Sequence, residues 1–426
     1  MSEIEEAGLP AREAAVHYLE AALARRAGLD EALATPASTR LDPRERAFAR
    51  ALTMATLRRL GAIDRALQAK LKKEPPERVV TLLRLGMAQL FWMGVPDHAA
   101  VSTIVAIADK TNATRPFKGL VNAVLRGLLR DGPPKDDPET LAPDWLLARW
   151  KAAFGPEEAR AIATVIAQEP AADLSVKDPA DAAAVAEALG GEILPGGTVR
   201  TSLRGDIAEW PTFAEGRWWV QDAGAAIPAR LLAVEPGQTA LDLCAAPGGK
   251  TLQLAAAGAV TVAVDRSAER LKRVSENLAR LNLNAEIVAA DGILWKDERR
   301  FDAVLLDAPC SATGTFRRHP DVLWAASPTD IVKLAAVQKR LLDSAADRVK
   351  PKGRLVYCVC SLEPEEGEEQ VRAFLKRRPD FDLDPIEPGE GGAPEASVPD
   401  GWLRILPHHI VGGVDGFFAA RLVRRF

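Results

Sequence analysis

Short apolar runs alternate with helical segments throughout the chain after Gln221. The runs are rich in valine, isoleucine and leucine, and in order they read TALDLC, VTVAVD, AEIVAAD, FDAVLLDAP and GRLVYCVC. Such buried runs, separated by helices or long connections, are typical of a mostly parallel sheet with helices on both faces. The sequence therefore predicts an α/β domain, and its last apolar piece, GFFAARLVRRF, is expected to add a closing strand.

The part of the chain before this sheet has a different pattern. From Ala11 to about Arg130 apolar residues recur at spacings of three and four, which indicates an all-α bundle. Turn residues mark the expected ends of its helices, and they are Pro36, Pro75, Pro76, Pro96, Thr111 and Asn112. The segment DGPPKDDP, residues 131–138, has the proline and charge content of an interdomain linker.

Residues from Trp145 to about Glu215 combine two short helical patterns with β-prone pieces near residues 174–177, and we interpret them as a small α/β domain. A chain of 426 residues exceeds the length at which one core keeps growing. We therefore predict three domains: a helical domain over residues 1–135, a small α/β domain over 140–215 and the sheet domain over 216–426.

Composition excludes several classes of protein. The hydrophobic and charged fractions, 47% and 27%, fit an ordinary globular protein, and no apolar stretch approaches the length of about 18 residues needed to cross a membrane. The start, MSEIEEAGLP, lacks the features of a signal peptide, so we expect a cytoplasmic protein. The net charge of −4 does not by itself indicate nucleic-acid binding. One stretch without acids, however, carries Arg115, Lys118, Arg126 and Arg130.

The four cysteines are Cys244, Cys310, Cys358 and Cys360. Their spacing favours neither a disulfide framework nor a zinc site, and we expect no metal. For any single free cysteine, burial in the core is the simplest interpretation.

A glycine turn, AAPGGKT over residues 245–251, follows the first strand of the sheet and precedes a helix. Ligands of α/β sheets bind at the carboxyl ends of the strands, and such a turn lets them approach the backbone. The turn lacks the G-x-G-x-x-G of a dinucleotide site. It matches only the end of a P-loop, because Cys244 replaces the first glycine and Pro247 removes an N–H donor. An NTPase stays open as an alternative, with LLDAP as a Walker B strand.

Carboxylates at the strand ends favour a third ligand, an adenosyl group with a sulfonium in place of phosphates. Asp242, Asp265 and Asp291 end the first three strands. Asp265 has the position of an acid that accepts from both ribose hydroxyls. Asp291 is placed to accept from the adenine amino group. Each aspartate alone could instead cap a helix or a turn.

Two of the cysteines follow neighbouring strands. Cys310 lies in the loop after the fourth strand and Cys360 follows the fifth. If these strands are adjacent and parallel, their axes lie about 4.8 Å apart and both cysteines face one crevice. A thiolate that adds at carbon 6 of a pyrimidine turns carbon 5 into a nucleophile for a methyl group. Asp307 would bind N3 and N4 of cytosine, and a second group must remove the proton from carbon 5.

We interpret the acids after Cys360, which are Glu363, Glu365 and Glu366, as the first turn of a helix whose far end carries Lys376, Arg377 and Arg378. The N-terminus of that helix, together with Lys250, is expected to favour the thiolate form of Cys360. We expect Cys358 to pack inside its strand and Cys244 to line the wall of the site.

These motifs resemble the Sun/RsmB family of ribosomal RNA cytosine-C5 methyltransferases. The resemblance rests on LDLCAAPGGKT, LLDAPCSATG, RRHPD, CVCSLEPEE and DGFFAARL in the C-terminal half. The first segment resembles the NusB helical domain through HAAVSTIVAIADK and GLVNAVLRGLLR. The resemblance implies a Rossmann-like class I methyltransferase domain behind a NusB-like RNA-binding bundle, with the small α/β domain also contacting RNA.

The resemblance also implies S-adenosylmethionine as the methyl donor, Cys360 as the nucleophile and Cys310 as the cysteine that releases the product. Spacing alone leaves the order of the two cysteines open, since related DNA enzymes use the Pro-Cys cysteine as nucleophile. The expected catalytic residues are Cys360, Cys310, Asp307 and Lys250. The expected donor-binding residues are Cys244, Ala245, Ala246, Pro247, Gly248, Gly249, Lys250, Asp265, Arg266, Arg270, Asp291, Gly292 and Asp307.

Two positions depart from the family pattern. Val359 stands where the family usually has threonine before the nucleophile, and Gly224 stands where it more often has serine. We expect the partner to be 16S ribosomal RNA, not DNA and not a membrane, with Arg317, Arg318 and His319 at the entry of the base pocket and with the protein acting as a monomer. The alternatives are a cytosine-C5 methyltransferase of another RNA such as tRNA, and a non-catalytic NusB-like RNA-binding factor.

Overall fold

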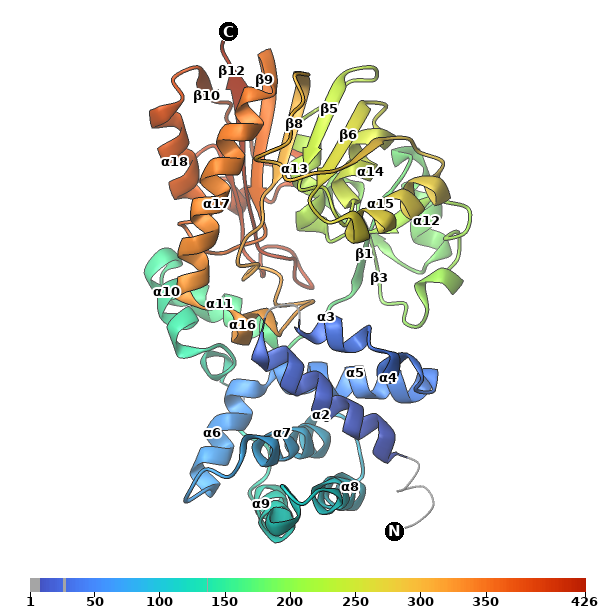
Figure 1. Cartoon of the computed structure of the whole chain (residues 1–426), viewed down its shortest axis with the longest axis vertical. Helices are drawn as coiled ribbons and strands as arrows, with labels where there is room; N and C mark the ends of the chain where they lie inside the picture. Colours follow the sequence, from blue (N-terminus) through green and yellow to red (C-terminus); the bar gives the residue numbers. More distant parts are fainter. Residues whose placement is uncertain (1–7, 26–27, 136) are drawn as a thin grey trace. The chain divides into compact units, whose positions relative to one another are not determined.

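The computed structural model of the chain describes residues 8–25, 28–135 and 137–426. The chain separates into two compact units (Figure 1): the first comprises Met1–Gln168 and His319–Ala326, and the second comprises Glu169–Arg318 and Ser327–Phe426. The finer division into three domains stays a prediction. No helix in the described ranges has the length and apolar character that crossing a membrane requires.

The first unit is helical, as its sequence period predicts. Its helices are α2 (Leu9–Ala24), α3 (Gly28–Leu33), α4 (Pro36–Thr39), α5 (Pro43–Arg58), α6 (Leu60–Lys70), α7 (Glu77–Trp92), α8 (Asp97–Lys110), α9 (Lys118–Asp131), α10 (Asp144–Phe154), α11 (Pro156–Ile166) and α16 (Val322–Ala325), with 3₁₀ turns η1 (Arg115–Phe117) and η2 (Pro138–Thr140). Apolar faces of α2, α5, α7, α8 and α9 meet in one core. The expected breaks are confirmed: Pro36 begins α4, Pro96 precedes α8, and Pro75 and Pro76 separate α6 from α7.

The second unit is built on an eight-stranded sheet with the order β10-β12-β9-β8-β5-β6-β7, and β11 pairs with β12. Its strands are β5 (Thr239–Leu243), β6 (Val260–Asp265), β7 (Glu286–Ala289), β8 (Phe301–Asp307), β9 (Val349–Val359), β10 (Phe381–Leu383), β11 (Leu403–Ile405) and β12 (Phe417–Arg424). Strands β7, β6, β5, β8 and β9 are mutually parallel, and β12 closes the sheet antiparallel to β9. The mostly parallel sheet and the closing strand are therefore confirmed.

Alternate residues of the strands bury against helices on opposite faces, as the pleat requires. Leu306 and Tyr357 join a core with α17 (Pro328–Asp347) and α18 (Glu368–Arg377). Leu305 and Cys358 join a separate core with α13 (Ala223–Leu231) and α14 (Gly249–Ala256). Helix α15 (Ala268–Leu281) packs with α14 in a third cluster.

The strand order places a switch point at the centre of this sheet. The chain runs outward from β5 to β6 and β7 and then returns to β8 on the other side of β5. Loops leaving β5 and β8 at their carboxyl ends diverge there, which opens the crevice where ligands of α/β sheets bind.

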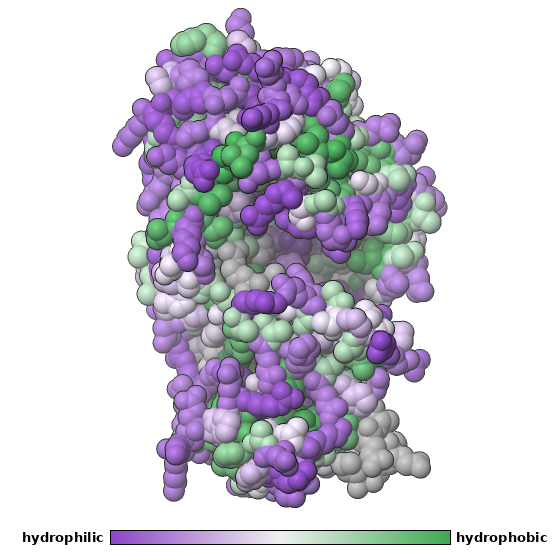
Figure 2. Space-filling view, in the orientation of Figure 1, coloured by the Kyte–Doolittle hydropathy of each residue, from purple (hydrophilic) through white to green (hydrophobic). Residues whose placement is uncertain are grey.

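A smaller antiparallel sheet with the order β2-β3-β1-β4 completes the second unit. Its strands are β1 (Ala172–Val176), β2 (Glu192–Ile193), β3 (Val199–Thr201) and β4 (Trp218–Val220), and helix α12 (Ala182–Ala188) connects β1 to β2. The remaining short elements are 3₁₀ turns: η3 (Pro179–Asp181), η4 (Pro195–Gly197), η5 (Ile207–Glu209), η6 (Glu390–Gly392) and η7 (Glu395–Ser397). The visible face of the protein is largely hydrophilic with scattered apolar residues (Figure 2), in keeping with the charged fraction of 27%.

One helix boundary differs from the expectation. Helix α18 begins at Glu368, so the acids at 363, 365 and 366 precede it and do not form its first turn. Glu363 and Glu366 are buried, and both accept hydrogen bonds from neighbouring loops. Burial of these two carboxylates among donors replaces the exposed first turn that the sequence suggested. The basic end is as predicted, with Lys376 and Arg377 in the last turn.

Candidate functional site

The glycine turn leaves β5 at the centre of the sheet. Residues 244–248 lead from Leu243 into α14, with Cys244 at φ 66° and Gly248 at φ 107°. A Cβ on Gly248 would lie 3.0 Å from the Val274 side chain, so both backbone angle and space require glycine there. The turn brings the backbone of Ala245, Ala246 and Pro247 to the switch point, where the sequence predicted a ligand.

Asp265 lies at the end of β6 and holds this turn. Its Oδ2 accepts from the Ala246 N–H at 3.1 Å, and its Oδ1 accepts from the Ser267 N–H at 2.9 Å. Arg270 donates to the Ala246 carbonyl from the other side. A carboxylate oxygen can accept more than one hydrogen bond, so Asp265 keeps acceptor capacity for hydroxyl groups of a ligand. Arg266 beside it is exposed.

Asp242 is a buried carboxyl at the same edge. Its Oδ2 accepts from Thr251 Oγ1 at 2.6 Å, and its Oδ1 has no hydrogen-bond partner among the described residues. Burial raises the pKa of Asp242 to about 7. The sequence marked Asp242 as a strand-end acid without giving it a site role, and the unpartnered oxygen now makes it a candidate site residue.

Asp291 follows β7 by two residues and is exposed. Its Oδ1 accepts from the Ile293 and Leu294 N–H groups at 2.8 and 3.3 Å, which is the turn-capping alternative. The carboxylate keeps acceptor capacity on its other oxygen. Gly292 next to it accepts from Ser344 Oγ through its carbonyl at 2.7 Å, which anchors this loop to α17.

Lys250 and Asp307 form an ion pair across the crevice. Lys250 Nζ lies 2.7 Å from Asp307 Oδ2 and 5.0 Å from the centre of the Phe417 ring. Burial acts to lower the pKa of Lys250, but the charge of Asp307 outweighs it and the pKa is raised. The lysine is thus held protonated on Asp307, whereas its place in the sequence suggested that it acts on Cys360.

Cys310 and Cys360 meet at the carboxyl ends of β8 and β9. Their sulfur atoms lie 3.5 Å apart. The strands pair in parallel with Asp307 opposite Cys358, and the Gly314 N–H donates to the Cys360 carbonyl at 3.0 Å. The predicted adjacency of the two strands and of the two cysteine loops is therefore confirmed.

The two sulfur atoms differ in their surroundings. Cys310 is buried and Cys360 is partly exposed. The pKa of Cys310 is raised well above its usual range, first by its hydrogen bond with Cys360 and then by burial. Cys358 is fully buried, as predicted, with its sulfur 3.6 Å from Asp307 Oδ1, and burial raises its pKa. Val359 is buried in the α17 side of the core, which suits an apolar residue in place of threonine.

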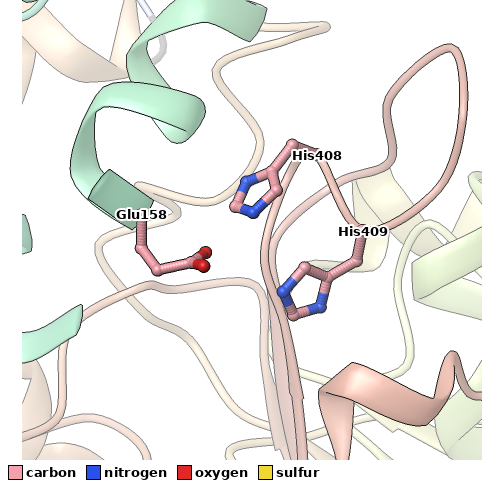
Figure 3. Close-up of side chains that lie close together, drawn as sticks. All are labelled: Glu158, His408 and His409. Atoms are coloured by element: carbon pink, nitrogen blue, oxygen red, sulfur yellow. The ribbon is translucent and has the colours of Figure 1, made fainter. Parts of the chain in front are cut away.

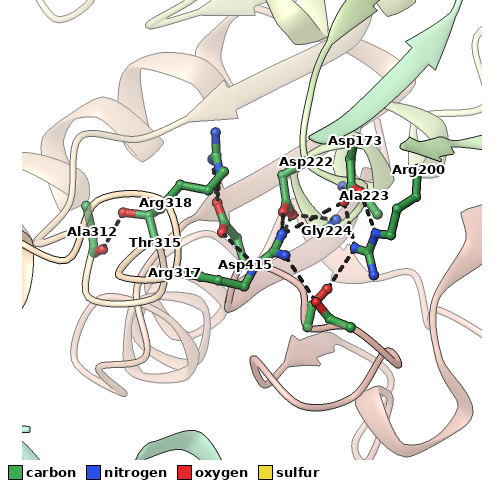
Figure 4. A network of polar contacts seen from close by, with 12 residues as sticks. Asp173, Arg200, Asp222, Ala223, Gly224, Ala312, Thr315, Arg317, Arg318 and Asp415 are labelled. Atoms are coloured by element: carbon green, nitrogen blue, oxygen red, sulfur yellow. Dashed lines mark hydrogen bonds and ion pairs between the residues drawn. The ribbon is translucent and has the colours of Figure 1, made fainter. Parts of the chain in front are cut away.

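A network of buried charges lies beside the cysteine loops (Figure 4). Arg317 is 1% exposed and donates to Asp222 Oδ2 at 2.5 Å, while Arg318 Nε donates to Asp415 Oδ2 at 2.8 Å. Arg200 pairs with Asp173 through two hydrogen bonds of 2.6 and 2.8 Å. Burial raises the pKa of Asp415 to about 6, although Arg318 acts against the increase.

This network corrects one expectation. Arg317 was expected to line the entry of a base pocket, but its guanidinium is enclosed by aspartates because an unpaired cation would be costly at that depth. Arg318 keeps an exposed fraction of 35% in its side chain and remains a candidate for the entry. His319 belongs to the first unit.

The network also fixes the loop between β11 and β12. Arg200 donates to the carbonyls of Val411 and Gly413, each at 2.7 Å. Within the same loop the His408 and His409 rings pack edge to face with centroids 5.0 Å apart (Figure 3), and His409 Nδ1 accepts from the Leu406 N–H at 3.3 Å. No pattern in the sequence marked this loop as part of the site.

The packing around Gly224 accounts for glycine at a position where the family more often has serine. It lies in the first turn of α13, where Asp222 caps the helix by accepting from the Gly224 N–H at 2.9 Å. A Cβ on Gly224 would lie 2.8 Å from the Asp415 carbonyl oxygen and 3.1 Å from Val414. A serine would therefore require the neighbouring loop to move.

Comparisons with known proteins identify the family of the chain. Residues 229–423 match the model of the 16S rRNA methyltransferase RsmB/F family, and residues 9–130 match the NusB family. The chain is 37% identical to ribosomal RNA small subunit methyltransferase B of Cronobacter sakazakii, over 92% of this chain and 93% of that protein. It is 38% identical to the protein of the same name from Pseudomonas syringae pv. tomato, over 97% and 96%.

Solved structures share the fold. The crystal structure of PH0851 aligns over 97% of this chain and 98% of its own, with a TM-score of 0.76 at 24% identity. A methyltransferase homolog protein from Pyrococcus horikoshii aligns over 66% of this chain and 95% of its own, with a TM-score of 0.57 at 28% identity. Together with relatives that match over most of their length, these findings show that the chain belongs to the ribosomal RNA small subunit methyltransferase B family.

Proposed function

We propose that this protein transfers a methyl group from S-adenosylmethionine to carbon 5 of a cytosine in 16S ribosomal RNA through a covalent adduct with Cys360. The observation that supports the proposal most directly is the 3.5 Å separation of the Cys310 and Cys360 sulfur atoms at the switch point of the sheet. Two thiols and a carboxylate at the carboxyl ends of adjacent strands provide a nucleophile, a proton acceptor and a group that recognises the base.

The acceptors at the strand ends fit an adenosyl group. Asp265 would accept from the ribose hydroxyls and Asp291 from the adenine amino group, while the turn from Cys244 to Gly249 would enclose the ligand with backbone. The unpartnered Oδ1 of Asp242 adds an acceptor at the same edge. S-adenosylmethionine supplies an electrophilic methyl group on a sulfonium, so carboxylates suit it better than the amide donors that phosphates need.

Asp307 and Lys250 would prepare the base. Asp307 is held by Lys250 at 2.7 Å and is proposed to bind N3 and N4 of the flipped cytosine. As a carboxylate Asp307 accepts from the N4 amino group, and it contacts N3, itself an acceptor, only with a proton that Lys250 passes to it. That proton would neutralise the charge that develops at N3 as the thiolate adds at carbon 6. Because Lys250 is anchored by the carboxylate and by the Phe417 ring, it keeps Asp307 oriented while the base enters.

The covalent steps then balance. The Cys360 thiolate would form a bond to carbon 6, and carbon 5 would take the methyl group as the bond from methyl to sulfonium sulfur breaks. Once Cys360 is bonded to the base, Cys310 would release its own proton to solvent, and its thiolate would then accept the proton from carbon 5. The bond between Cys360 and carbon 6 breaks as the ring double bond returns. The proton acceptor must act beside the nucleophile, and the sulfur separation allows this.

RNA contact by the first unit is part of the proposal. A groove of 720 Å³ lies between α8 and α9 and is lined in part by Lys110, Lys118 and Arg126. Lys118 and Arg115 also pair with Asp109, so part of the basic stretch is neutralised within the bundle. A cytoplasmic location and a monomeric state stay predictions.

Incubation with labelled S-adenosylmethionine and undermodified small-subunit RNA tests the function. We expect label in 5-methylcytosine at one position, which bisulfite sequencing of RNA from cells lacking the protein would identify as unmethylated. Transfer to tRNA and not to 16S RNA would support the tRNA alternative. RNA binding without transfer would support a non-catalytic factor, and ATP hydrolysis by the same preparation would support an NTPase.

A further inference from the structure

A buried carboxylate, Glu366, lies between the two cysteine loops. It is 0% exposed and follows Cys360 by six residues, ahead of α18. Its Oε1 accepts from the Ser311 N–H at 2.9 Å and from Gln338 Nε2 at 3.0 Å. Its Oε2 accepts from Ser361 Oγ at 2.6 Å and from the Ser311 hydroxyl.

These donors connect Glu366 with both cysteines. Ser311 directly follows Cys310, and Ser361 directly follows Cys360. One carboxylate therefore joins the loop after β8 to the end of β9 at the residues next to the two sulfur atoms. The Tyr357 hydroxyl donates to the Glu366 carbonyl at 2.5 Å, which fixes the backbone that carries the carboxylate.

The donors that contact the Glu366 carboxylate in the described part of the chain are neutral. Arg404 lies near, but its guanidinium donates to the Ser361 carbonyl at 2.6 Å and to Glu368. Burying a carboxylate without a cation is costly unless several donors satisfy it, so a neutral side chain would be the simpler choice for packing alone. A buried negative charge disfavours the ionised form of a neighbouring thiol.

The charge of Glu366 acts on the thiol of Cys310. Glu366 accepts from the backbone of the loop that carries Cys310, whereas it reaches the Cys360 side through the Ser361 hydroxyl only. Its charge contributes to the raised pKa of Cys310, after the hydrogen bond with Cys360 and burial. The charge of Arg318 interacts with Cys360.

We propose that Glu366 is a positioning residue for the cysteine pair: it fixes the separation of the two sulfur atoms and keeps the proton on Cys310 until the adduct has formed, so that Cys360 is the thiolate that attacks. This inference rests on the proposed function and adds a physical reason, within this chain, for the order of the two cysteines. The hydrogen bond between the sulfur atoms is then donated by Cys310 and accepted by Cys360.

The test is alkylation of the full-length protein by iodoacetamide at neutral pH, without RNA or cofactor, with the rate at each cysteine read by peptide mass spectrometry. We expect Cys360 to react at least tenfold faster than Cys310, since thiolates and not thiols are alkylated. Glu366→Gln is expected to reduce that ratio about tenfold, which corresponds to one pKa unit. An unchanged ratio in folded Glu366→Gln protein would overturn the proposal.

Two further variants separate charge from position. Glu366→Asp keeps the charge on a shorter side chain, so we expect it to retain the alkylation ratio while kcat for methyl transfer falls at unchanged KM. Ser311→Ala removes one hydroxyl donor and also keeps the charge, so it too should retain the ratio while kcat falls. If Glu366→Gln does not fold, an unchanged kcat in both Glu366→Asp and Ser311→Ala would overturn the proposal. The matched control is Asp302→Asn, which removes a carboxylate at the opposite end of β8 and is expected to leave the ratio unchanged.

Failure of this inference and failure of the proposed function give different results. If the wild-type protein shows the selective reaction of Cys360 but transfers no methyl group, the proposed function is wrong. If it transfers methyl groups while Glu366→Gln keeps both the alkylation ratio and kcat, Glu366 has a structural role only.

Discussion

Lys250 Nζ donates to Asp307 Oδ2 at 2.7 Å and thereby joins the first turn of α14 to the last residue of β8. The pair spans the switch point of the sheet, so it connects the turn proposed to hold the donor with the strand proposed to present the base.

Lys250→Ala is expected to leave Asp307 without its cation. Methyl transfer should fall about 100-fold, and the free energy of unfolding should fall by about 1–3 kcal/mol, because a charge with partial burial loses its partner. Urea unfolding and single-turnover transfer measure the two effects. Lys350→Ala is the control, since Lys350 pairs with Asp302 near solvent. If Lys350→Ala lowers the free energy of unfolding by more than about 1 kcal/mol, the contrast between a buried and an exposed ion pair is wrong.

Cys310→Ala is expected to trap the protein on RNA, because the proton on carbon 5 then has no acceptor and the Cys360 adduct cannot break. Denaturing gels should show a stable protein–RNA band for Cys310→Ala and none for Cys360→Ala. Cys358→Ala removes a buried sulfur that is not proposed to react, and it should yield no adduct. A band with Cys360→Ala would reverse the order of the two cysteines.

Asp265→Asn is expected to weaken binding of S-adenosylmethionine about 10- to 100-fold, since hydrogen bonds to a charged acceptor contribute about 1.5–3 kcal/mol each. Equilibrium dialysis with labelled donor measures the dissociation constant. Asp297→Asn changes an acid that pairs with Arg299 on the surface and should leave binding as it was. Equal effects from both variants would remove the support for Asp265 as a ligand.

Arg317→Met is expected to lower the free energy of unfolding by about 3–5 kcal/mol, because Asp222 and its neighbours are left buried without their cation. Denaturant titration measures the loss. The exposed pair of Arg425 and Asp382 supplies the comparison, and Arg425→Ala should change stability by less than about 1 kcal/mol. If both substitutions lower the free energy of unfolding equally, burial of Arg317 is not the cause of the lost stability.

Asp242 is expected to make stability fall as pH rises. Its pKa is raised to about 7 in the folded protein by burial, so between about pH 4 and 7 the folded state binds more protons than the unfolded state. The stabilisation from the neutral carboxyl, up to about 4 kcal/mol, is lost over that window. Asp242→Asn should remove this part of the slope in urea midpoints measured from pH 4 to 8.

Asp302 is the opposite case and the internal control. Burial acts to raise its pKa, but hydrogen bonds from Thr239 and Lys350 outweigh it and lower the pKa to about 2. Its contribution to stability is present above about pH 4 and is lost as pH falls toward 2. Asp302→Asn should therefore leave the slope between pH 4 and 7 in place, and a common effect of both variants would refute the assignment.

Local patterns in the sequence determined the helices of the first unit, the positions of the main strands along the chain in the second unit, and the acids at the ends of those strands. Helical periodicity and runs of branched residues act over a few neighbours, so they can be read without knowing the partner. The glycine turn and the candidate carboxylates Asp265 and Asp307 belong to this category, because each directly follows or ends a strand that the pattern predicts.

Only the tertiary structure decided which of these groups meet. The contact between Cys310 and Cys360 depends on parallel pairing of β8 with β9, strands that the sequence separates by α16 and α17. The burial of Arg317 among aspartates and of Glu366 among hydroxyls depends on segments distant in the chain, and both side chains look like exposed surface residues in the sequence. Charge and hydrogen-bond partners are set by packing across the sheet, and no local period encodes them.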